Sequence, residues 1–266
     1  MKVVLFCGGA GMRLRDYADH IPKPLVNIGQ RPILWHLMKY YSHFGHKDFV
    51  LCLGYGAHKI KEFFLKYDEW STNDFVLSHG GRNVELLSTD IDEWTITFVD
   101  TGHDSNVGER LRRVQHHLDG EEVFLANYAD GLSDLPLDVY VDSFLAKDKV
   151  ASFVTVPVQH TYHIVHTNGG GEVTGLEPVA SSSLRINGGF FVLRQEIFDY
   201  MRPHEELVFE PFDRLIEEQR LLAYPYDGFW RAMDTFKDKV ELDRIVAAGD
   251  PAWEVWKQPP TRLAAG

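Results

Sequence analysis

The sequence predicts an α/β fold, with a Rossmann-like, mainly parallel mixed sheet flanked by helices and carrying β-rich insertions. Two observations carry this prediction. The first part of the chain alternates short apolar runs, typical of buried strands, with segments whose apolar residues recur at helical spacing. Strand–helix–strand units of this kind form right-handed crossovers and therefore parallel strands. Runs between residues 74 and 100 are strand-like without an intervening helix, and these indicate the insertions.

The elements follow from the same patterns in chain order. Pro32 stands at the first turn of the first helix, a position that favours proline. The triplet Gly169-Gly170-Gly171 indicates the turn of a hairpin over residues 162–176. The other expected strands are 3–7, 48–53, 75–77, 84–87, 94–99, 122–126, 151–156, 190–193 and 221–224. The expected helices are 33–41, 57–66, 108–118, 195–201, 210–219 and 235–248.

Composition and charge limit the class of protein. The 266 residues are 44% hydrophobic and 25% charged, as in a globular chain that can build its own core. A net charge of -12 argues against nucleic-acid binding, which usually shows a basic footprint. No signal peptide or membrane-length apolar run is present, so we expect no membrane association and a cytoplasmic location. Cys7 and Cys52 lie in apolar runs and are expected to be buried free thiols.

A glycine-rich turn after the first strand is the main functional signal. Gly8, Gly9 and Gly11 let backbone N–H groups approach an anion without a Cβ in the way. Arg13 and Lys23 follow and supply positive charge for phosphate oxygens. The pattern predicts that a nucleoside triphosphate lies over this turn.

Two common phosphate motifs do not fit the turn. A Walker loop ends in Gly-Lys-Ser/Thr, whereas Gly11 is followed by Met12 and Arg13. The dinucleotide fingerprint needs a third glycine where this chain has Leu14. A dinucleotide oxidoreductase is therefore a distant alternative.

The turn instead resembles the sugar-phosphate nucleotidyltransferase signature, in Gly8-Gly9-Ala10-Gly11-Met12-Arg13-Leu14 followed by Pro22-Lys23-Pro24. Over almost its whole length the chain resembles the glucose-1-phosphate cytidylyltransferase family. The other matching segments are 32–42, 48–55, 99–102, 110–114, 187–193 and 228–235. The resemblance implies a fold of the nucleotide-diphospho-sugar transferase type and a homo-oligomer. It also implies one nucleotidyltransferase domain over 1–250, with a nucleotide-binding part to about 135, an acceptor-binding part over about 136–235 and a tail over 251–266.

The resemblance also implies the reaction and the site. CTP and a sugar 1-phosphate would give a CDP-sugar and pyrophosphate, with Mg²⁺ held by Asp130 and Asp234. Arg13 and Lys23 would be catalytic. The implied nucleotide-binding residues are Leu5, Cys7, Gly8, Gly9, Gly11, Met12, Arg13, Lys23, Arg110 and Ala129. The implied acceptor-binding residues are His163, Asn187, Gly188 and Trp230.

This chemistry needs no general base. A phosphate monoester loses its second proton near pH ~6, so at neutral pH it is already an anionic nucleophile. Catalysis then rests on alignment and on cations that offset the repulsion between two anions. Simpler interpretations stay open: Asp234 as a helix cap, Arg110 as a solvated helix charge, and Trp230 as part of the core.

Four positions depart from the family pattern. Met12 replaces a threonine, Ala129 replaces a glycine before Asp130, Val179 stands where the family has a lysine for the sugar phosphate, and the Tyr162-His163 step replaces an aromatic–glycine step. The losses fall mainly on the acceptor side. We therefore expect an acceptor other than glucose 1-phosphate, either another sugar phosphate or a phosphonate, with Arg185 or His163 as a compensating cation.

Two further rivals stay open. UTP or dTTP would replace CTP if a few loop contacts differ. A catalytically inactive nucleotide-binding homologue would explain the losses at Met12 and Val179, whereas the retained Lys23, Asp130 and Asp234 argue for an enzyme.

Overall fold

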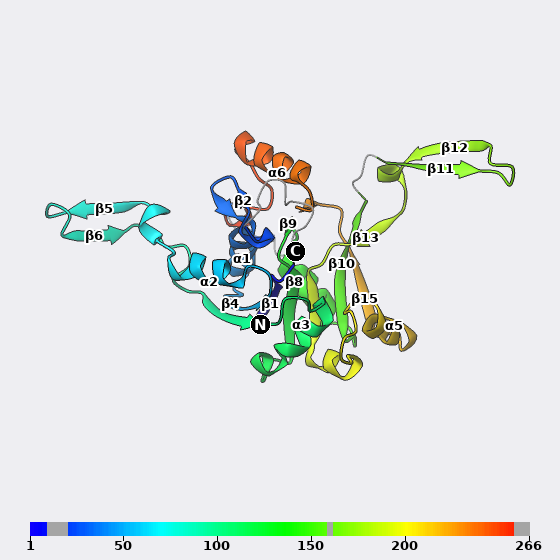
Figure 1. The fold of residues 1–266 in the computed structure, drawn as a ribbon, viewed down its shortest axis with the longest axis horizontal. Helices are drawn as coiled ribbons and strands as arrows, with labels where there is room; N and C mark the ends of the chain where they lie inside the picture. The colour runs from blue at the N-terminus through cyan, green and yellow to red at the C-terminus, as the bar shows by residue number, and fades with distance from the viewer. Residues whose placement is uncertain (10–20, 159–161, 258–266) are drawn as a thin grey trace, which may run out of the picture.

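A mixed sheet of eight strands forms the centre of the computed structural model, which describes residues 1–9, 21–158 and 162–257 (Figure 1). The strand order is β13-β10-β14-β8-β1-β4-β7, and β15 pairs with β10. The strands β8, β1, β4 and β7 run parallel, whereas β14 is antiparallel to both β8 and β10. This arrangement confirms the predicted fold class. The bounds are β1 Val3–Phe6, β4 Asp48–Leu53, β7 Thr95–Asp100, β8 Val123–Tyr128, β10 Ala151–Pro157, β13 Arg185–Asn187, β14 Phe191–Arg194 and β15 Leu221–Pro225.

Successive residues of the central strands pack on opposite faces of the sheet, as the two-residue period of a strand requires. In β1, Leu5 packs in one apolar cluster and Val4 in the other. The two thiols separate in the same way, because Cys7 lies in the first cluster and Cys52 in the second. Both thiols are free and buried, as predicted.

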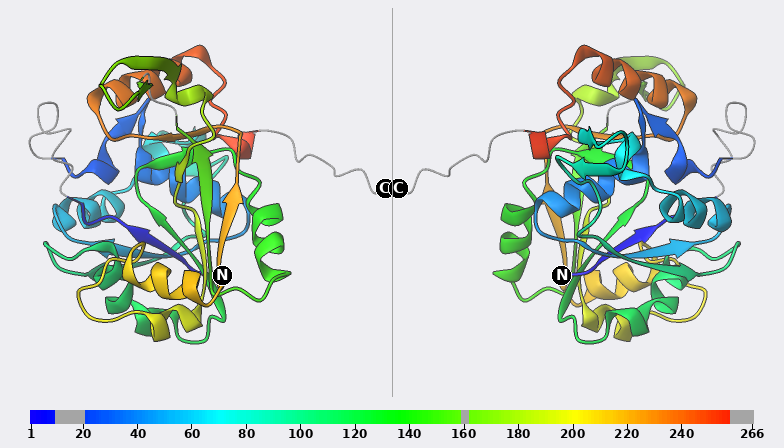
Figure 2. Two further views of the ribbon diagram at one scale, coloured as in Figure 1. Left: turned by 90° about the vertical axis from the view of Figure 1, so that its right-hand side faces the viewer. Right: turned by 90° about the vertical axis from the view of Figure 1, so that its left-hand side faces the viewer.

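Helices cover both faces of the sheet (Figure 2). α1 (Ile33–His43) and α4 (Leu137–Leu145) contribute to the first cluster, and α3 (Val107–Arg113) and α5 (Glu210–Glu217) contribute to the second. The other helices are α2 (Ala57–Leu65) and α6 (Phe236–Ala248). Short 3₁₀ segments span Lys23–Leu25, Glu69–Ser71, Gln115–Leu118, Val179–Ser181, Gln195–Tyr200 and Val255–Lys257. In the described part of the chain, no helix is both long and apolar enough to cross a membrane.

Two hairpins project to opposite sides of the sheet (Figure 1). One joins β5 (Phe75–Ser78) to β6 (Asn83–Leu86), and the other joins β11 (His163–Thr167) to β12 (Val173–Pro178). The β5–β6 hairpin is an insertion that the strand-like runs predicted, and β11–β12 is the hairpin predicted over residues 162–176. The run at 94–99 instead forms β7 of the central sheet. Two smaller sheets complete the fold. One pairs β2 (Asn27–Ile28) with β3 (Arg31–Pro32), and the other pairs β9 (Gly131–Ser133) with β16 (Trp230–Ala232).

Some elements differ from the sequence prediction. The helix expected over 108–118 is α3 followed by a 3₁₀ turn, and the one expected over 195–201 is a 3₁₀ segment. The sequence patterns did not reveal α4, β9 or β16. The tail from residue 258 lies outside the described residues.

Candidate active site

Lys23 joins two carboxylates that are far apart in the sequence. Its ammonium nitrogen, Nζ, lies 2.5 Å from Asp130 Oδ2 and 2.8 Å from Asp234 Oδ1. The Lys23 side chain is only 14% exposed, whereas that of Asp234 is 54% exposed. Burial lowers the pKa of Lys23, but the two carboxylates raise it by more, so the pKa lies above its ordinary value. The group is an ammonium at neutral pH.

Lys23, Asp130 and Asp234 are each positioned by a different local feature of the backbone. Pro22 and Pro24 restrict the backbone on both sides of Lys23, and Pro24 is buried. Asp130 follows β8 at the carboxyl end of a parallel strand, where α/β sheets place their ligands. Asp234 follows β16.

The pairing of β9 with β16 is what brings the two carboxylates together. Ala232 lies opposite Gly131, and the backbone N–H of Met233 donates to the carbonyl oxygen of Asp130 at 2.9 Å. This register sets Asp130 and Asp234 side by side at one edge of the small sheet. Asp234 is not a helix cap, because the capping box of α6 is formed by Thr235 and Asp238.

A cavity of about 290 Å³ opens beside the two carboxylates. Its lining includes three of the four residues expected to bind the acceptor, namely Asn187, Gly188 and Trp230. The indole N–H of Trp230 donates to the carbonyl oxygen of Gly188 at 2.8 Å, which fixes the ring at the wall. Five further residues line this cavity and were not expected there from the sequence: Asn127, Tyr128, Gly131, Ile186 and Ala232. Asn127 could have been predicted as a lining residue, because it stands near the carboxyl end of β8.

Neither of the cations expected on the acceptor side lines this cavity. His163 lies on the projecting β11 and Val179 follows β12, so neither lines the cavity. Arg185 is held elsewhere: its guanidinium donates to Asp227 at 2.8 Å and to the carbonyl oxygen of Thr155 at 2.7 Å. Among the described residues, Lys23 is the cation that contacts the carboxylates of this cavity.

The glycine turn begins next to Asp130. β1 and β8 are parallel neighbours with Phe6 opposite Tyr128, so Gly8 and Gly9 leave the sheet beside Ala129 and Asp130. Leu5 and Cys7 are fully buried and position the turn from within the core. Gly11, Met12 and Arg13 lie outside the described residues.

Arg110 is buried below this turn and is not a solvated helix charge. It is 4% exposed, and its guanidinium donates to the carbonyl oxygens of Gly8 at 3.1 Å, Leu53 at 3.1 Å and Gly102 at 2.9 Å. A further hydrogen bond goes to the hydroxyl of Thr101 at 2.8 Å. Burial lowers the pKa of Arg110 below its ordinary value. The side chain therefore links the carboxyl ends of β1, β4 and β7.

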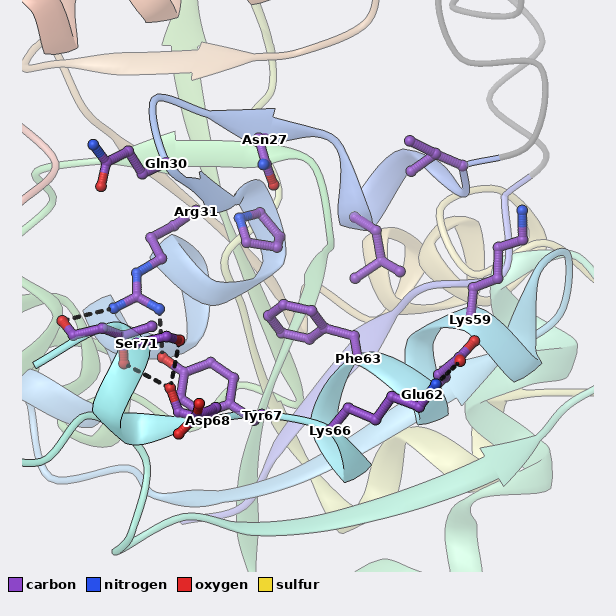
Figure 3. A pocket seen from close by; sticks show the side chains of 14 residues that line it. Asn27, Gln30, Arg31, Lys59, Glu62, Phe63, Lys66, Tyr67, Asp68 and Ser71 are labelled. Carbon is purple, nitrogen blue, oxygen red and sulfur yellow. Dashed lines mark hydrogen bonds and ion pairs between the residues drawn. The ribbon is translucent and has the colours of Figure 1, made fainter. Parts of the chain in front are cut away.

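A larger cavity, of about 610 Å³, lies between the β2–β3 sheet and α2 (Figure 3). Phe63 projects into it, and several of its charged groups are paired within the protein. Arg31 contacts Asp90 at 2.7 Å, and Lys66 contacts Glu62 at 2.5 Å. Its lining contains neither Asp130 nor Asp234, and we therefore place the candidate active site at the smaller cavity.

The two carboxylates suit a magnesium ion. Mg²⁺ prefers oxygen ligands, keeps several waters, and is usually bound by one or two carboxylates together with substrate phosphates. Asp130 and Asp234 offer such a pair of oxygens within reach of one cation, as their shared contact with Lys23 shows. Among the described residues, no group of three or more His, Cys, Asp or Glu side chains is arranged to hold a metal.

Comparison with known proteins settles the family. A family model described as nucleotidyl transferase matches residues 2–246. This chain belongs to the nucleotidyl transferase family.

Relatives match the chain along nearly all of its length. A probable glucose-1-phosphate cytidylyltransferase of Bacillus subtilis strain 168 is 36% identical over 258 residues, which cover 96% of this chain and 100% of that protein. The glucose-1-phosphate cytidylyltransferase of Salmonella typhimurium is 35% identical over 259 residues, covering 97% of this chain and 100% of that protein. A solved structure of a putative glucose-1-phosphate thymidylyltransferase from Bacillus anthracis shares the fold, with a TM-score of 0.68 at 14% identity over 92% of this chain and 94% of that one.

Proposed function

We propose that this nucleotidyltransferase joins CTP to a sugar 1-phosphate, or to a similar phosphate or phosphonate acceptor, and releases pyrophosphate. One structural observation supports this most directly. Asp130 and Asp234 gather around Lys23 at the carboxyl end of β8, between the glycine turn and a cavity of a size to hold a small acceptor. The names of the relatives support CTP as the donor and a hexose 1-phosphate as the acceptor.

Each group of residues would have its own role in binding the substrates. The backbone at Gly8 and Gly9, with Lys23 and Arg13, would receive the triphosphate. Asn187 and Trp230 would bound the acceptor cavity. Mg²⁺ held by Asp130 and Asp234 would neutralise charge on the phosphates of both substrates.

The acceptor phosphate attacks the α-phosphorus of CTP, a new P–O bond forms, and the bond to the departing pyrophosphate breaks. Both reactants are anions, so the main work of the site is alignment and charge neutralisation. The absence of an acceptor-side lysine at Val179 supports an acceptor that relies on Lys23 and the metal for this neutralisation.

Pyrophosphate release over a matrix of nucleotides and acceptors tests the proposal. CTP, UTP and dTTP would each be offered with glucose 1-phosphate, other hexose 1-phosphates and a phosphonate, with and without Mg²⁺. Release with CTP and one of these acceptors supports the proposal. CTP binding without pyrophosphate release from any pair would show a nucleotide-binding homologue instead.

We also infer that the chain forms a homo-oligomer through its projecting hairpins. Directly paired residues share a face of a hairpin. On the β11–β12 hairpin the pair Val165 and Leu176 is 53% and 65% exposed. On the β5–β6 hairpin Phe75 and Leu77 share a face and are 43% and 59% exposed. Isolated two-stranded hairpins are marginally stable in water, so an apolar face of this kind favours a covering partner.

The compartment we propose is the cytoplasm. The free thiols of Cys7 and Cys52 support a reducing environment.

A further inference from the structure

The ammonium of Lys23 stands between the two carboxylates that would bind the metal. Its Nζ contacts Asp130 Oδ2 at 2.5 Å and Asp234 Oδ1 at 2.8 Å, so one cation holds both side chains together. A divalent cation that took both oxygens as ligands would need the space between them that Nζ occupies. The ammonium and such an ion therefore exclude one another in this conformation.

Electrostatic repulsion between the two carboxylates favours a cation in the space between them. Two carboxylates this close repel each other unless a cation lies between them or one takes up a proton. Asp234 is half exposed, and a salt bridge to so exposed a group is weak and exchangeable. Asp130 is 26% exposed, so solvent also reaches the second contact.

Lys23 can leave without disturbing its backbone. The lysine side chain is a flexible four-carbon stem with three N–H donors. Two of these donors are used by Asp130 and Asp234. Pro22 and Pro24 restrict the main chain on either side, so rotation of the stem moves the ammonium while the backbone stays in place.

We propose that Lys23 is an exchangeable placeholder for the divalent metal, and that a triphosphate releases the carboxylates by drawing the ammonium onto its own oxygens. This inference rests on the proposed metal-binding role of Asp130 and Asp234. It makes nucleotide and metal binding cooperative, because a ligand that removes the ammonium opens the metal site. The carboxylate pair then exchanges one positive charge for two.

Binding of Mn²⁺ alone, followed by electron paramagnetic resonance of the free ion, tests the exchange without nucleotide and without turnover. Lys23→Met removes the ammonium and leaves the carboxylates facing each other. We expect Mn²⁺ to bind this variant about tenfold or more tightly than the wild type, since a unit charge a few ångströms from the ion is removed. Lys23→Gln, which keeps a hydrogen-bond donor, serves as a second neutral variant if Lys23→Met folds poorly.

Three controls separate this effect from a general change of charge or fold. Lys23→Arg keeps a cation and should bind Mn²⁺ as weakly as the wild type. Lys237→Met removes a positive charge from an exposed position three residues after Asp234 and should change nothing. Adding Asp130→Asn to Lys23→Met should abolish the gain. Thermal unfolding of each variant checks that it is folded.

Mn²⁺ binding that is equal or weaker in both neutral Lys23 variants would overturn the exchange. The proposed function is judged separately, by Mg²⁺-dependent pyrophosphate release from the wild type. If the wild type releases pyrophosphate and the neutral variants bind Mn²⁺ no more tightly, the metal site is supported and the placeholder role of Lys23 is refuted. If no pyrophosphate is released but the neutral variants bind Mn²⁺ more tightly, the exchange of Lys23 for the metal is supported and the proposed reaction is refuted.

Discussion

The guanidinium of Arg110 donates a hydrogen bond of 3.1 Å to the carbonyl oxygen of Gly8, the first residue of the glycine turn. The contact is close because Gly8 has no side chain. A Cβ built on Gly8 would lie 2.0 Å from Nη1 of Arg110. The start of the glycine turn, at Gly8, is thus held by a buried arginine.

Gly8→Ala should destabilise the protein, whereas its neighbour offers a matched control. Overpacking of this kind costs about 1–3 kcal/mol of unfolding free energy, and here it also displaces Arg110. Gly9→Ala should be nearly neutral, because no described atom lies within 4 Å of the position that the new methyl group would take. Urea unfolding of both variants checks this, and equal losses would contradict the contact.

Arg110→Lys should lower stability by roughly 3 kcal/mol, since hydrogen bonds to a charged group contribute about 1.5–3 kcal/mol each and lysine cannot reach all of the acceptors. Arg112→Lys, on the same helix but more exposed, is the control. Denaturant unfolding and CTP binding are measured together. Unchanged stability with lost CTP binding would show that Arg110 contacts the nucleotide and does not brace the strand ends.

Stability should fall as the pH drops below about 6.5, in part through His36. Burial lowers the pKa of His36, and its backbone hydrogen bond to Ile28 raises the pKa by less. The unfolded chain therefore binds a proton near pH 6.5 that the folded protein does not bind. The free energy of unfolding decreases as the pH falls further. One such group contributes a slope of at most about 1.4 kcal/mol per pH unit.

The variant His36→Gln isolates this contribution. Glutamine can still donate to Ile28, whose carbonyl oxygen lies 3.0 Å from Nε2 of His36. His46, whose pKa burial lowers to about 4, follows the same trend and stays in both proteins. Unfolding between pH 7 and pH 5 should show a shallower slope in the variant, and identical slopes would exclude His36 as a source.

Leu176→Glu should reduce the proposed oligomer to smaller species. Leu176 is 65% exposed beside Val165, and a buried charge on that face would oppose association. Glu177→Gln changes the opposite face of the same hairpin and should leave the mass unchanged. Light scattering coupled to size exclusion measures both. A wild type that is already monomeric would refute the hairpin interface.

The central strands could be predicted from sequence because they are buried on both faces. β4 has the predicted bounds, since its apolar run is bounded by polar and glycine residues. α4 was missed although Leu137, Tyr140, Val141 and Phe144 recur at helical spacing. Its valines and aromatic residues are also typical of a strand. The segment forms a helix because this arrangement buries those four side chains on one face.

The site could be predicted only through resemblance. Asp130 and Asp234 meet because β9 pairs with β16, and strands of three residues leave no periodic signal. The contact of Lys23 with both carboxylates depends on that tertiary pairing and was not foreseen. Arg110 was expected at the phosphates, and its hydrogen bonds to strand-end carbonyls follow from packing that no local pattern encodes.

Pyrophosphate release from CTP and the acceptor that turns over best in the matrix of acceptors, in the wild type and in Asp130→Asn with and without Mg²⁺, tests the central claim most directly. The claim is that Asp130 and Asp234 hold the metal for nucleotidyl transfer. We expect Mg²⁺-dependent release by the wild type and a loss of about 100-fold or more in the variant, as for other removed electrostatic groups. The same rate in the variant, or release that does not need Mg²⁺, would contradict it.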